Sequence, residues 1–216
     1  MKNTIITSLL FVIILNSCRN NVNENQSIEI EAGIETSIEK VDTLQPITNI
    51  DKIERARELM VNVLQWSDSV QSFHLLTFNQ NDSVFNSIDT LQLERNLELL
   101  NSSRYFTQNF IDNYENIIRT ISKKLNNGEY PIWYPGELPP FYFSSDLNPW
   151  CLCQDNYGWN SIKVEVINEK EGEFKWTWKE LNTNNWSYTF KVINVKNQIK
   201  IDYLEGFDYA NSINAD

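Results

Sequence analysis

The chain has 216 residues and carries 29 acidic against 18 basic side chains, which gives a net charge of −11 at pH 7. This excess of negative charge argues against nucleic-acid binding, because phosphates are contacted by clustered lysines and arginines. A single histidine and three cysteines are too few for an ordinary structural zinc site, which takes about four ligands. We therefore expect no metal, no cofactor and no nucleic-acid partner.

The first 18 residues have the features of an export signal. Lys2 precedes an apolar run over residues 5–15, which suits a secretory signal and is shorter than the roughly 20 residues of a bilayer-spanning helix. The run ends in the letters LNSC, with Cys18 last, and this resembles the lipobox of bacterial lipoproteins. The resemblance implies cleavage before Cys18 and acylation of its sulfur. It places the protein in the cell envelope, lipid-anchored in the outer membrane and facing the periplasm or the cell surface. An ordinary signal peptide and an uncleaved anchor are the alternatives.

Residues 18–50 have the composition of a tether. No aromatic residue occurs between positions 19 and 49, and acidic residues are frequent, so the segment cannot bury enough apolar surface to fold. A random coil of about 30 residues spans on the order of 30 Å, which would lift a folded domain clear of the bilayer. Within it, residues 42–44 (DTL) resemble a bacterial O-glycosylation site, in which Thr43 would carry the sugar.

A long helix is predicted to open the folded part. Apolar residues recur at helical spacing from Ile53 to Phe73, and Asp51 is suited to cap the N-terminus. This pattern predicts a helix over residues 51–78, ended by the polar stretch 79–82 (NQND).

Two further helices are predicted before residue 128. The first covers residues 90–101 and has Asp89 or Thr90 as its cap, and the second starts at Ser102 or Ser103 and ends at an Asn-Gly pair. Apolar residues at helical spacing are expected to form the buried face of the second: Phe106, Phe110, Tyr114, Ile117, Ile118, Ile121 and Leu125.

Residues 130–159 are rich in proline and aromatic residues, which excludes regular helix and requires that the segment pack against something. The aromatic side chains either fill the space between sheet and helices or form a binding surface for a sugar or a protein. A binding surface would expose at least two of the three aromatic candidates, whereas a core would bury them. The candidate binding residues are Trp150, Gln154, Asp155, Tyr157 and Trp159.

Cys151 and Cys153 remain as an isolated pair if Cys18 is acylated. We expect two half-buried thiols. The first alternative is a disulfide across one intervening residue, which would be strained and easily reduced, and the second is a metal site.

The last third of the chain alternates between apolar and polar residues with period two, which predicts an antiparallel sheet with one buried face. Turns are expected at residues 168–172, 182–185 and 196–197. The four predicted strands centre on residues 162–166, 174–178, 186–192 and 199–203.

The order of these elements resembles the NTF2-like and cystatin-like α+β folds. Residues 103–114 (SRYFTQNFIDNY), residues 148–155 (NPWCLCQD) and the closing hairpin 192–203 are similar to stretches of NTF2-like lipoproteins of unknown function. The resemblance implies a curved antiparallel sheet of about four strands with N-terminal helices packed on it, a cone with a possible pocket at its open end. It implies no activity, because this fold hosts enzymes and binding modules alike. The expected domains are a signal peptide (1–17), an acylated tether (18–50), the α+β domain (51–208) and a tail (209–216).

Three classes of function remain open. A non-catalytic module that binds a ligand or an envelope protein comes first, and an immunity protein that neutralises a toxin at the membrane comes second. The third is an enzyme that uses a carboxylate in the cone, either Asp155 with Tyr157 or Asp202 with Tyr203. A packed aromatic core would favour the first class, and a dry polar pocket with a perturbed carboxylate the third. His74 is expected to be a solvated or satisfied histidine.

Overall fold

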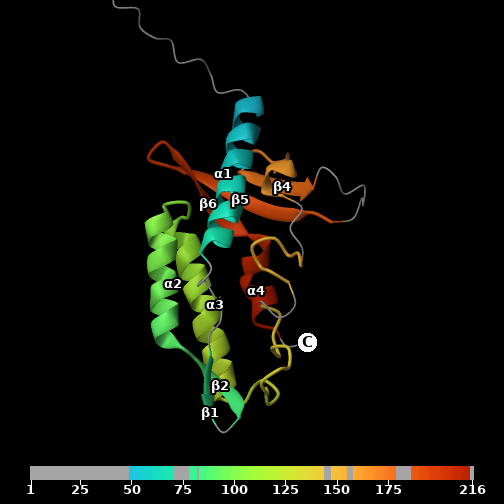
Figure 1. The fold of residues 1–216 in the computed structure, drawn as a ribbon. Coiled ribbons are helices and arrows are strands. Elements are labelled where there is room, and N and C mark those ends of the chain that lie inside the picture. Colours follow the sequence, from blue (N-terminus) through green and yellow to red (C-terminus); the bar gives the residue numbers. More distant parts are fainter. Residues whose placement is uncertain are drawn as a thin grey trace, which may run out of the picture. The chain divides into compact units, whose positions relative to one another are not determined.

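The computed structural model describes residues 49–70, 78–81, 83–143, 147–154, 158–178 and 186–214. These residues belong to one compact unit that begins at Gln45. Helices and a four-stranded antiparallel sheet make up this unit, which confirms the predicted α+β class (Figure 1). The predicted signal peptide, Cys18, Thr43 and His74 lie outside the described residues. No helix within the described ranges combines the length and the apolar character needed to cross a bilayer.

The four predicted strands pair in sequence order, β3-β4-β5-β6, and all neighbours are antiparallel. Inward-facing side chains alternate with outward-facing ones in β4 and in the first half of β5, as the period of two predicted. The turn between β5 and β6 uses Lys196 and Asn197, with φ of 50° and 67°, the left-handed pair that a two-residue hairpin turn requires. The predicted turn at 182–185 lies outside the described residues. The strands are β3 (Ile162–Asn168), β4 (Glu173–Trp178), β5 (Tyr188–Val195) and β6 (Gln198–Leu204).

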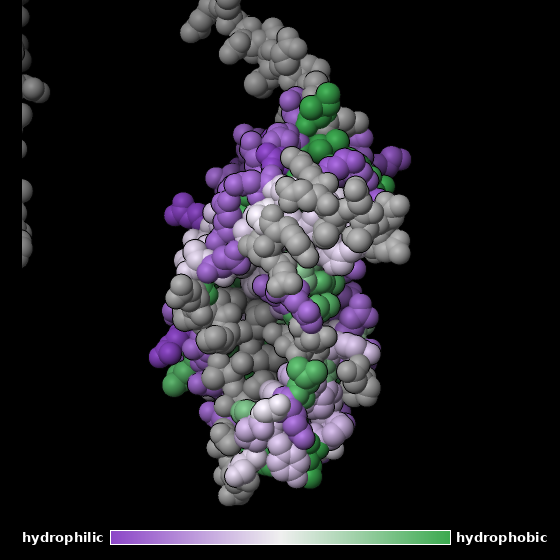
Figure 2. Space-filling model, turned by 45° about the vertical axis from the view of Figure 1, so that its right-hand side comes forward, coloured by the Kyte–Doolittle hydropathy of each residue, from purple (hydrophilic) through white to green (hydrophobic). Residues whose placement is uncertain are grey.

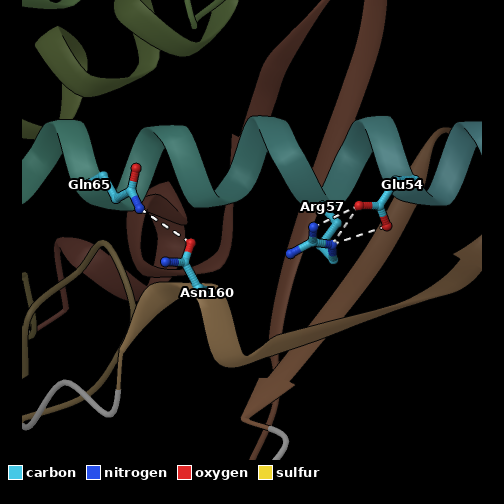
Figure 3. A network of polar contacts seen from close by, with 4 residues as sticks. All are labelled: Glu54, Arg57, Gln65 and Asn160. Carbon is cyan, nitrogen blue, oxygen red and sulfur yellow. Dashed lines mark hydrogen bonds and ion pairs between the residues drawn. The ribbon is translucent and has the colours of Figure 1, made fainter.

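The first helix, α1 (Asn49–Ser69), crosses the sheet and packs on β3 and β6 (Figure 1). Arg57 forms an ion pair with Glu54 on the same helix, and Gln65 donates to Asn160 in the turn before β3 (Figure 3). The predicted extension of this helix to residue 78 is wrong, since the helix ends at Ser69 and residue 78 begins a strand.

A two-stranded hairpin, β1 (Phe78–Asn81) and β2 (Val84–Ile88), follows where only a helix break was predicted. Its second strand contacts residues of the proline- and aromatic-rich range 130–159, called the aromatic segment below. The Phe85 amide donates to the Trp133 carbonyl at 2.9 Å, and the two rings lie 4.3 Å apart. This pairing spans about fifty residues of sequence, so no local pattern indicated it.

Helices α2 (Thr90–Ser103) and α3 (Gln108–Asn126) lie side by side (Figure 1). Asp89 caps α2, as predicted. Thr107 rather than Ser102 or Ser103 caps α3, because residues 104–107 lie along β6: the Ile201 amide donates to the Tyr105 carbonyl, and the Thr107 amide donates to the Ile201 carbonyl. Tertiary pairing has therefore moved the start of this helix by about one turn.

The expected tail contributes to the domain. Two short elements, η2 (Glu205–Phe207) and α4 (Tyr209–Ser212), follow β6, and α4 packs on α3. The amides of Phe143 and Tyr142 donate to the carbonyls of Ser212 and Asn214. Residues 209–214 thus anchor the aromatic segment rather than extend away from it.

Candidate functional site

Trp150 belongs to the hydrophobic core. It is 4% exposed and packs among aromatic rings from α1, the start of α3 and η2, with the Phe207 ring centroid at 4.6 Å. The loop that carries Trp150 is residues 148–153, called the disulfide loop below. Tyr188 donates its hydroxyl to the Pro149 carbonyl at 2.8 Å and fixes this loop to β5. Gly206 lies so close to the Pro149 carbonyl that a Cβ there would stand 1.9 Å from its oxygen.

Trp159 is also buried, at 7% exposure, in the 3₁₀ turn η1 (Trp159–Ser161) before β3. Its indole Nε1 donates to the Asp68 carboxylate at the end of α1. Trp150 and Trp159 are two of the three aromatic candidates, and neither has the exposure expected of a binding surface. Gln154 is exposed, and Asp155 and Tyr157 lie outside the described residues, so binding through these three residues stays a prediction.

Four indole rings meet at this end of the sheet and are called the tryptophan cluster: Trp159, Trp176, Trp178 and Trp186. Trp159 stacks on Trp178, whose ring centroid is 5.1 Å away, and Trp176 meets Trp186 edge-on at 4.7 Å. Trp176 is fully buried, and its Nε1 has no acceptor among the described residues. Such a group costs free energy when it is desolvated, so the cluster is stabilised by packing and not by polar bonds at Trp176.

Cys151 and Cys153 form a disulfide, so the prediction of two thiols is wrong and the first alternative is confirmed. The bridge spans a single residue, with the two Cα atoms 5.1 Å apart. Cys151 is fully buried and Cys153 is half-buried. Leu152 between them has φ of 49°, in the left-handed region that branched side chains rarely adopt.

Asp202 has a structural role. Its carboxylate accepts from the Thr107 hydroxyl at 2.7 Å, and Thr107 in turn caps α3 by accepting from the Phe110 amide. The neighbouring Tyr203 hydroxyl has its pKa raised to about 12, because burial and the nearby Asp208 and Glu205 charges disfavour the phenolate. The hydrogen bond to Thr107 accounts for the position of Asp202 through the cap of α3, so nothing in the geometry of this pair singles it out for catalysis.

An open cleft of about 740 Å³ lies between the α3 start, β5, β6 and α4. We call it the acidic cleft, after its four carboxylates. Asp202 holds Thr107, Glu205 accepts from the Thr189 amide at 2.6 Å, and Asp208 accepts from the Asn211 amide as the cap of α4. Most of this negative charge therefore also organises the local backbone. The carboxylates are those of Glu173, Asp202, Glu205 and Asp208.

The end of the sheet away from the tryptophan cluster carries a groove that the sequence patterns did not predict. It has a volume of about 380 Å³ and lies between the first turns of α1, the β3–β4 turn and the β5–β6 hairpin. Val166 and Ile193 are 39% and 41% exposed there. Elsewhere, on the face shown in Figure 2, apolar surface forms small separate patches. The residues that define this apolar groove are Val166, Phe174, Val192, Ile193 and Ile199, with Lys52 and Arg55 at the rim.

Backbone contacts shape the groove. The Val192 amide donates to the Gly172 carbonyl at 2.9 Å, which brings the β3–β4 turn onto β5. Gly172 has φ of 62°, and a Cβ there would lie 2.2 Å from the Val192 oxygen, so only glycine allows this approach. No sequence signal marked Val166 as exposed, because it shares a face of β3 with the buried Ile162 and Val164 and the period of two predicts that it is buried as well.

The charges at the rim are partly paired. Lys52 forms an ion pair of 2.7 Å with Glu169 across the groove mouth. Arg55, one turn further along α1, forms no ion pair with any residue that the structure describes, and it is half-buried. The groove therefore combines an apolar floor with a guanidinium that is available to a ligand.

Comparison of the chain with family models, with curated proteins and with solved structures finds no match. In the described ranges, no three His, Cys, Asp or Glu side chains are grouped so as to hold a metal ion.

Proposed function

We propose that the chain is a membrane-anchored envelope lipoprotein whose folded domain is a non-catalytic binding module, and that its ligand or protein partner binds in the apolar groove. The groove carries this proposal. Its volume of about 380 Å³ falls at the lower end of the range for small-ligand sites, roughly 300–1,000 Å³. Two aliphatic side chains of its lining, Val166 and Ile193, are 39% and 41% exposed.

The packed aromatic segment supports a binding module over an enzyme. Trp150 and Trp159 are buried in the core. Of the two carboxylate–tyrosine pairs considered for catalysis, Asp202 with Tyr203 serves a helix cap and Asp155 with Tyr157 lies outside the described residues. A guanidinium beside an apolar floor suits a ligand with an apolar body and an anionic group, because arginine binds carboxylates and phosphates through its paired N–H donors.

Two adjacent residues offer a matched test of the groove. Val166 lines it, whereas Ile167, 50% exposed on the same strand, does not. The full chain, extracted from its own envelope with mild detergent, is compared as parent, Val166→Lys and Ile167→Lys by mass spectrometry of co-purifying proteins and small molecules. We expect Val166→Lys to lose a species that the parent and Ile167→Lys retain. Equal retention by both variants would exclude the groove as the binding site.

Anchoring has a separate test. The lipobox at Cys18 supports attachment through lipid, and Cys18→Ala should either release the protein from the membrane fraction or leave it unprocessed with its signal attached. A variant that is processed and membrane-bound like the parent would overturn the lipoprotein assignment without bearing on the groove.

The acidic cleft favours the immunity protein as a second candidate function. Its four carboxylates face one lysine, Lys191, and negative charge of this kind steers a basic partner. Glu173, which is half-buried there, can be changed without touching a helix cap. If a basic toxin is the partner, Glu173→Lys should slow the association of the toxin and weaken the dependence of the association rate on salt. Val166→Lys should leave both quantities unchanged. Capture that responds to Val166→Lys alone would favour the groove.

A further inference from the structure

The Cys151–Cys153 disulfide contributes little as a structural cross-link. Disulfides stabilise proteins mainly by closing long loops in the unfolded chain, and the effect falls as the loop shortens. This bridge closes a loop with one residue between the cysteines and joins no separate elements. Hydrogen bonds already hold the disulfide loop: the Asn148 amide donates to the Cys153 carbonyl, and the Leu152 amide donates to the Asn148 carbonyl. The bond therefore needs an explanation other than stability.

Backbone strain is concentrated between the two sulfurs. Leu152 has φ of 49°, and any residue with a Cβ is disfavoured in this region by contact between that Cβ and its own backbone. The conformation is held from both sides, because the Leu152 amide donates to Asn148 and the Leu152 carbonyl accepts from the Trp186 indole. Opening the S–S bond removes the covalent constraint on this residue and leaves only these two hydrogen bonds to oppose relaxation of its backbone.

The two sulfurs also differ in access. Cys153 is half-buried and is followed by the exposed Gln154, whereas Cys151 is fully buried. A thiolate from solvent therefore meets Cys153 first. Strained or accessible disulfides are the ones that exchange readily, whereas unstrained buried bonds resist reduction.

We propose that Cys151–Cys153 is a thiol-exchange site that accepts two electrons from a dithiol, an activity separate from ligand binding in the groove. A thiolate of the dithiol attacks Cys153 Sγ and forms a mixed disulfide, while the Cys151–Cys153 bond breaks and Cys151 leaves as a thiolate that takes up a proton. The second thiol of the dithiol loses its proton and attacks its partner sulfur in the mixed disulfide. Cys153 is expelled as a thiolate and is protonated. The dithiol becomes a disulfide, and the protein holds two thiols.

The structure provides a matched pair of variants for the role of strain. Leu152→Gly removes the cost of the left-handed backbone beside the disulfide. Lys196→Gly removes the same kind of cost in the β5–β6 turn, where Lys196 has φ of 50° and lies far along the chain from the cysteines. The full chain in detergent is equilibrated with mixtures of reduced and oxidised glutathione, quenched with a thiol-alkylating reagent and analysed by mass.

The parent should be partly reduced in these mixtures while its tryptophan fluorescence stays native. Leu152→Gly should lower the equilibrium constant for reduction about tenfold, which corresponds to about 30 mV for two electrons, and Lys196→Gly should leave that constant unchanged. A parent that stays oxidised in millimolar reduced glutathione, or that is reduced only on unfolding, would overturn the proposal. Equal constants for Leu152→Gly and the parent would overturn the role of strain.

Variants that keep only one of the two cysteines of the disulfide loop test which sulfur is attacked. With oxidised glutathione, the Cys153 thiol of Cys151→Ser should form a mixed disulfide more than about tenfold faster than the Cys151 thiol of Cys153→Ser, because access limits exchange at a buried sulfur. Equal rates, or the reverse order, would overturn the assignment of Cys153 as the point of attack. Dithiothreitol should reduce the parent without accumulating the mixed disulfide, since its second thiol completes the exchange.

Discussion

The two ends of the four-stranded sheet differ in what covers their apolar side chains. Where β4 ends and β5 begins, the fully buried Trp176 and Tyr188 lie beneath η1 and the disulfide loop. At the other end, the β3–β4 turn and the β5–β6 hairpin leave Val166 and Ile193 substantially exposed. Aromatic residues crowd the covered end, and aliphatic residues line most of the open end. The tryptophans at the covered end therefore belong to the core, although the segment 130–159 that supplies some of them also exposes Ile132, Tyr134, Leu138 and Tyr142.

The largest effect is expected at the centre of the covered end. Trp176→Ala should lower the free energy of unfolding by about 3–5 kcal/mol, because it removes a fully buried indole that contacts Trp159, Trp178 and Trp186. Urea denaturation followed by fluorescence measures it. Lys175→Ala, at the adjacent position on the other face of β4, should change stability by less than about 0.5 kcal/mol. Small and equal costs would show that the register of β4 is misassigned.

Trp159→Ala should separate packing from binding. Loss of its stacking on Trp178 and of its bond to Asp68 should lower the free energy of unfolding by about 3 kcal/mol. Capture of envelope partners by the protein that remains folded should be unchanged. A thermal melt and a pull-down on the same variant measure both quantities. Lost capture with an unchanged melting temperature would instead make Trp159 part of a binding surface.

Tyr188→Phe should weaken the contact between β5 and the disulfide loop. The hydroxyl donates to Pro149 and accepts from the Gly206 amide, and its loss should cost about 1–3 kcal/mol, since buried partners are left unpaired.

The same residue should contribute to the pH dependence of stability. Burial raises the pKa of the Tyr188 hydroxyl well above its ordinary value of 10.0, so the folded state favours the neutral phenol. Its contribution is complete below pH 10 and is lost as the pH rises above 10, where the unfolded chain releases the proton first. Denaturant melts across this range should show a shallower alkaline loss of stability for Tyr188→Phe. An unchanged slope would contradict the assignment of that loss to Tyr188.

The smallest effect on stability is expected at the open end. Val166→Lys places a charged side chain at a position that is already 39% exposed, and it should change the free energy of unfolding by less than about 0.5 kcal/mol. Unchanged stability with lost capture in Val166→Lys would be the reverse of the lost stability and retained capture expected for Trp159→Ala. A loss of several kcal/mol would mean that the groove is closed in solution and that its floor belongs to the core.

Much of the secondary structure followed from local patterns. The period of two predicted β3–β6, a cap at Asp89 or Thr90 marked the start of α2, and helical spacing predicted the buried face of α3. Asp89 could be named as a cap because its side chain bonds to amides within three residues. These features depend on neighbours in sequence, which is why they could be read without a structure.

Tertiary contacts decided the rest. The hairpin β1–β2 depends on the Phe85–Trp133 pairing, and the start of α3 depends on residues 105–107 lying along β6. Both join residues far apart in the chain. Periodicity likewise shows which side chains share a face, but not whether another element covers it. Trp150 and Trp159 suited either interpretation, and only the fold shows that other elements bury them. Val166 continues the buried pattern of Ile162 and Val164 to the end of β3, where the first turns of α1 leave it 39% exposed. The sequence by itself determined the alternation of the strands and the faces of the helices. The fold alone decided which of those faces stays open to a partner.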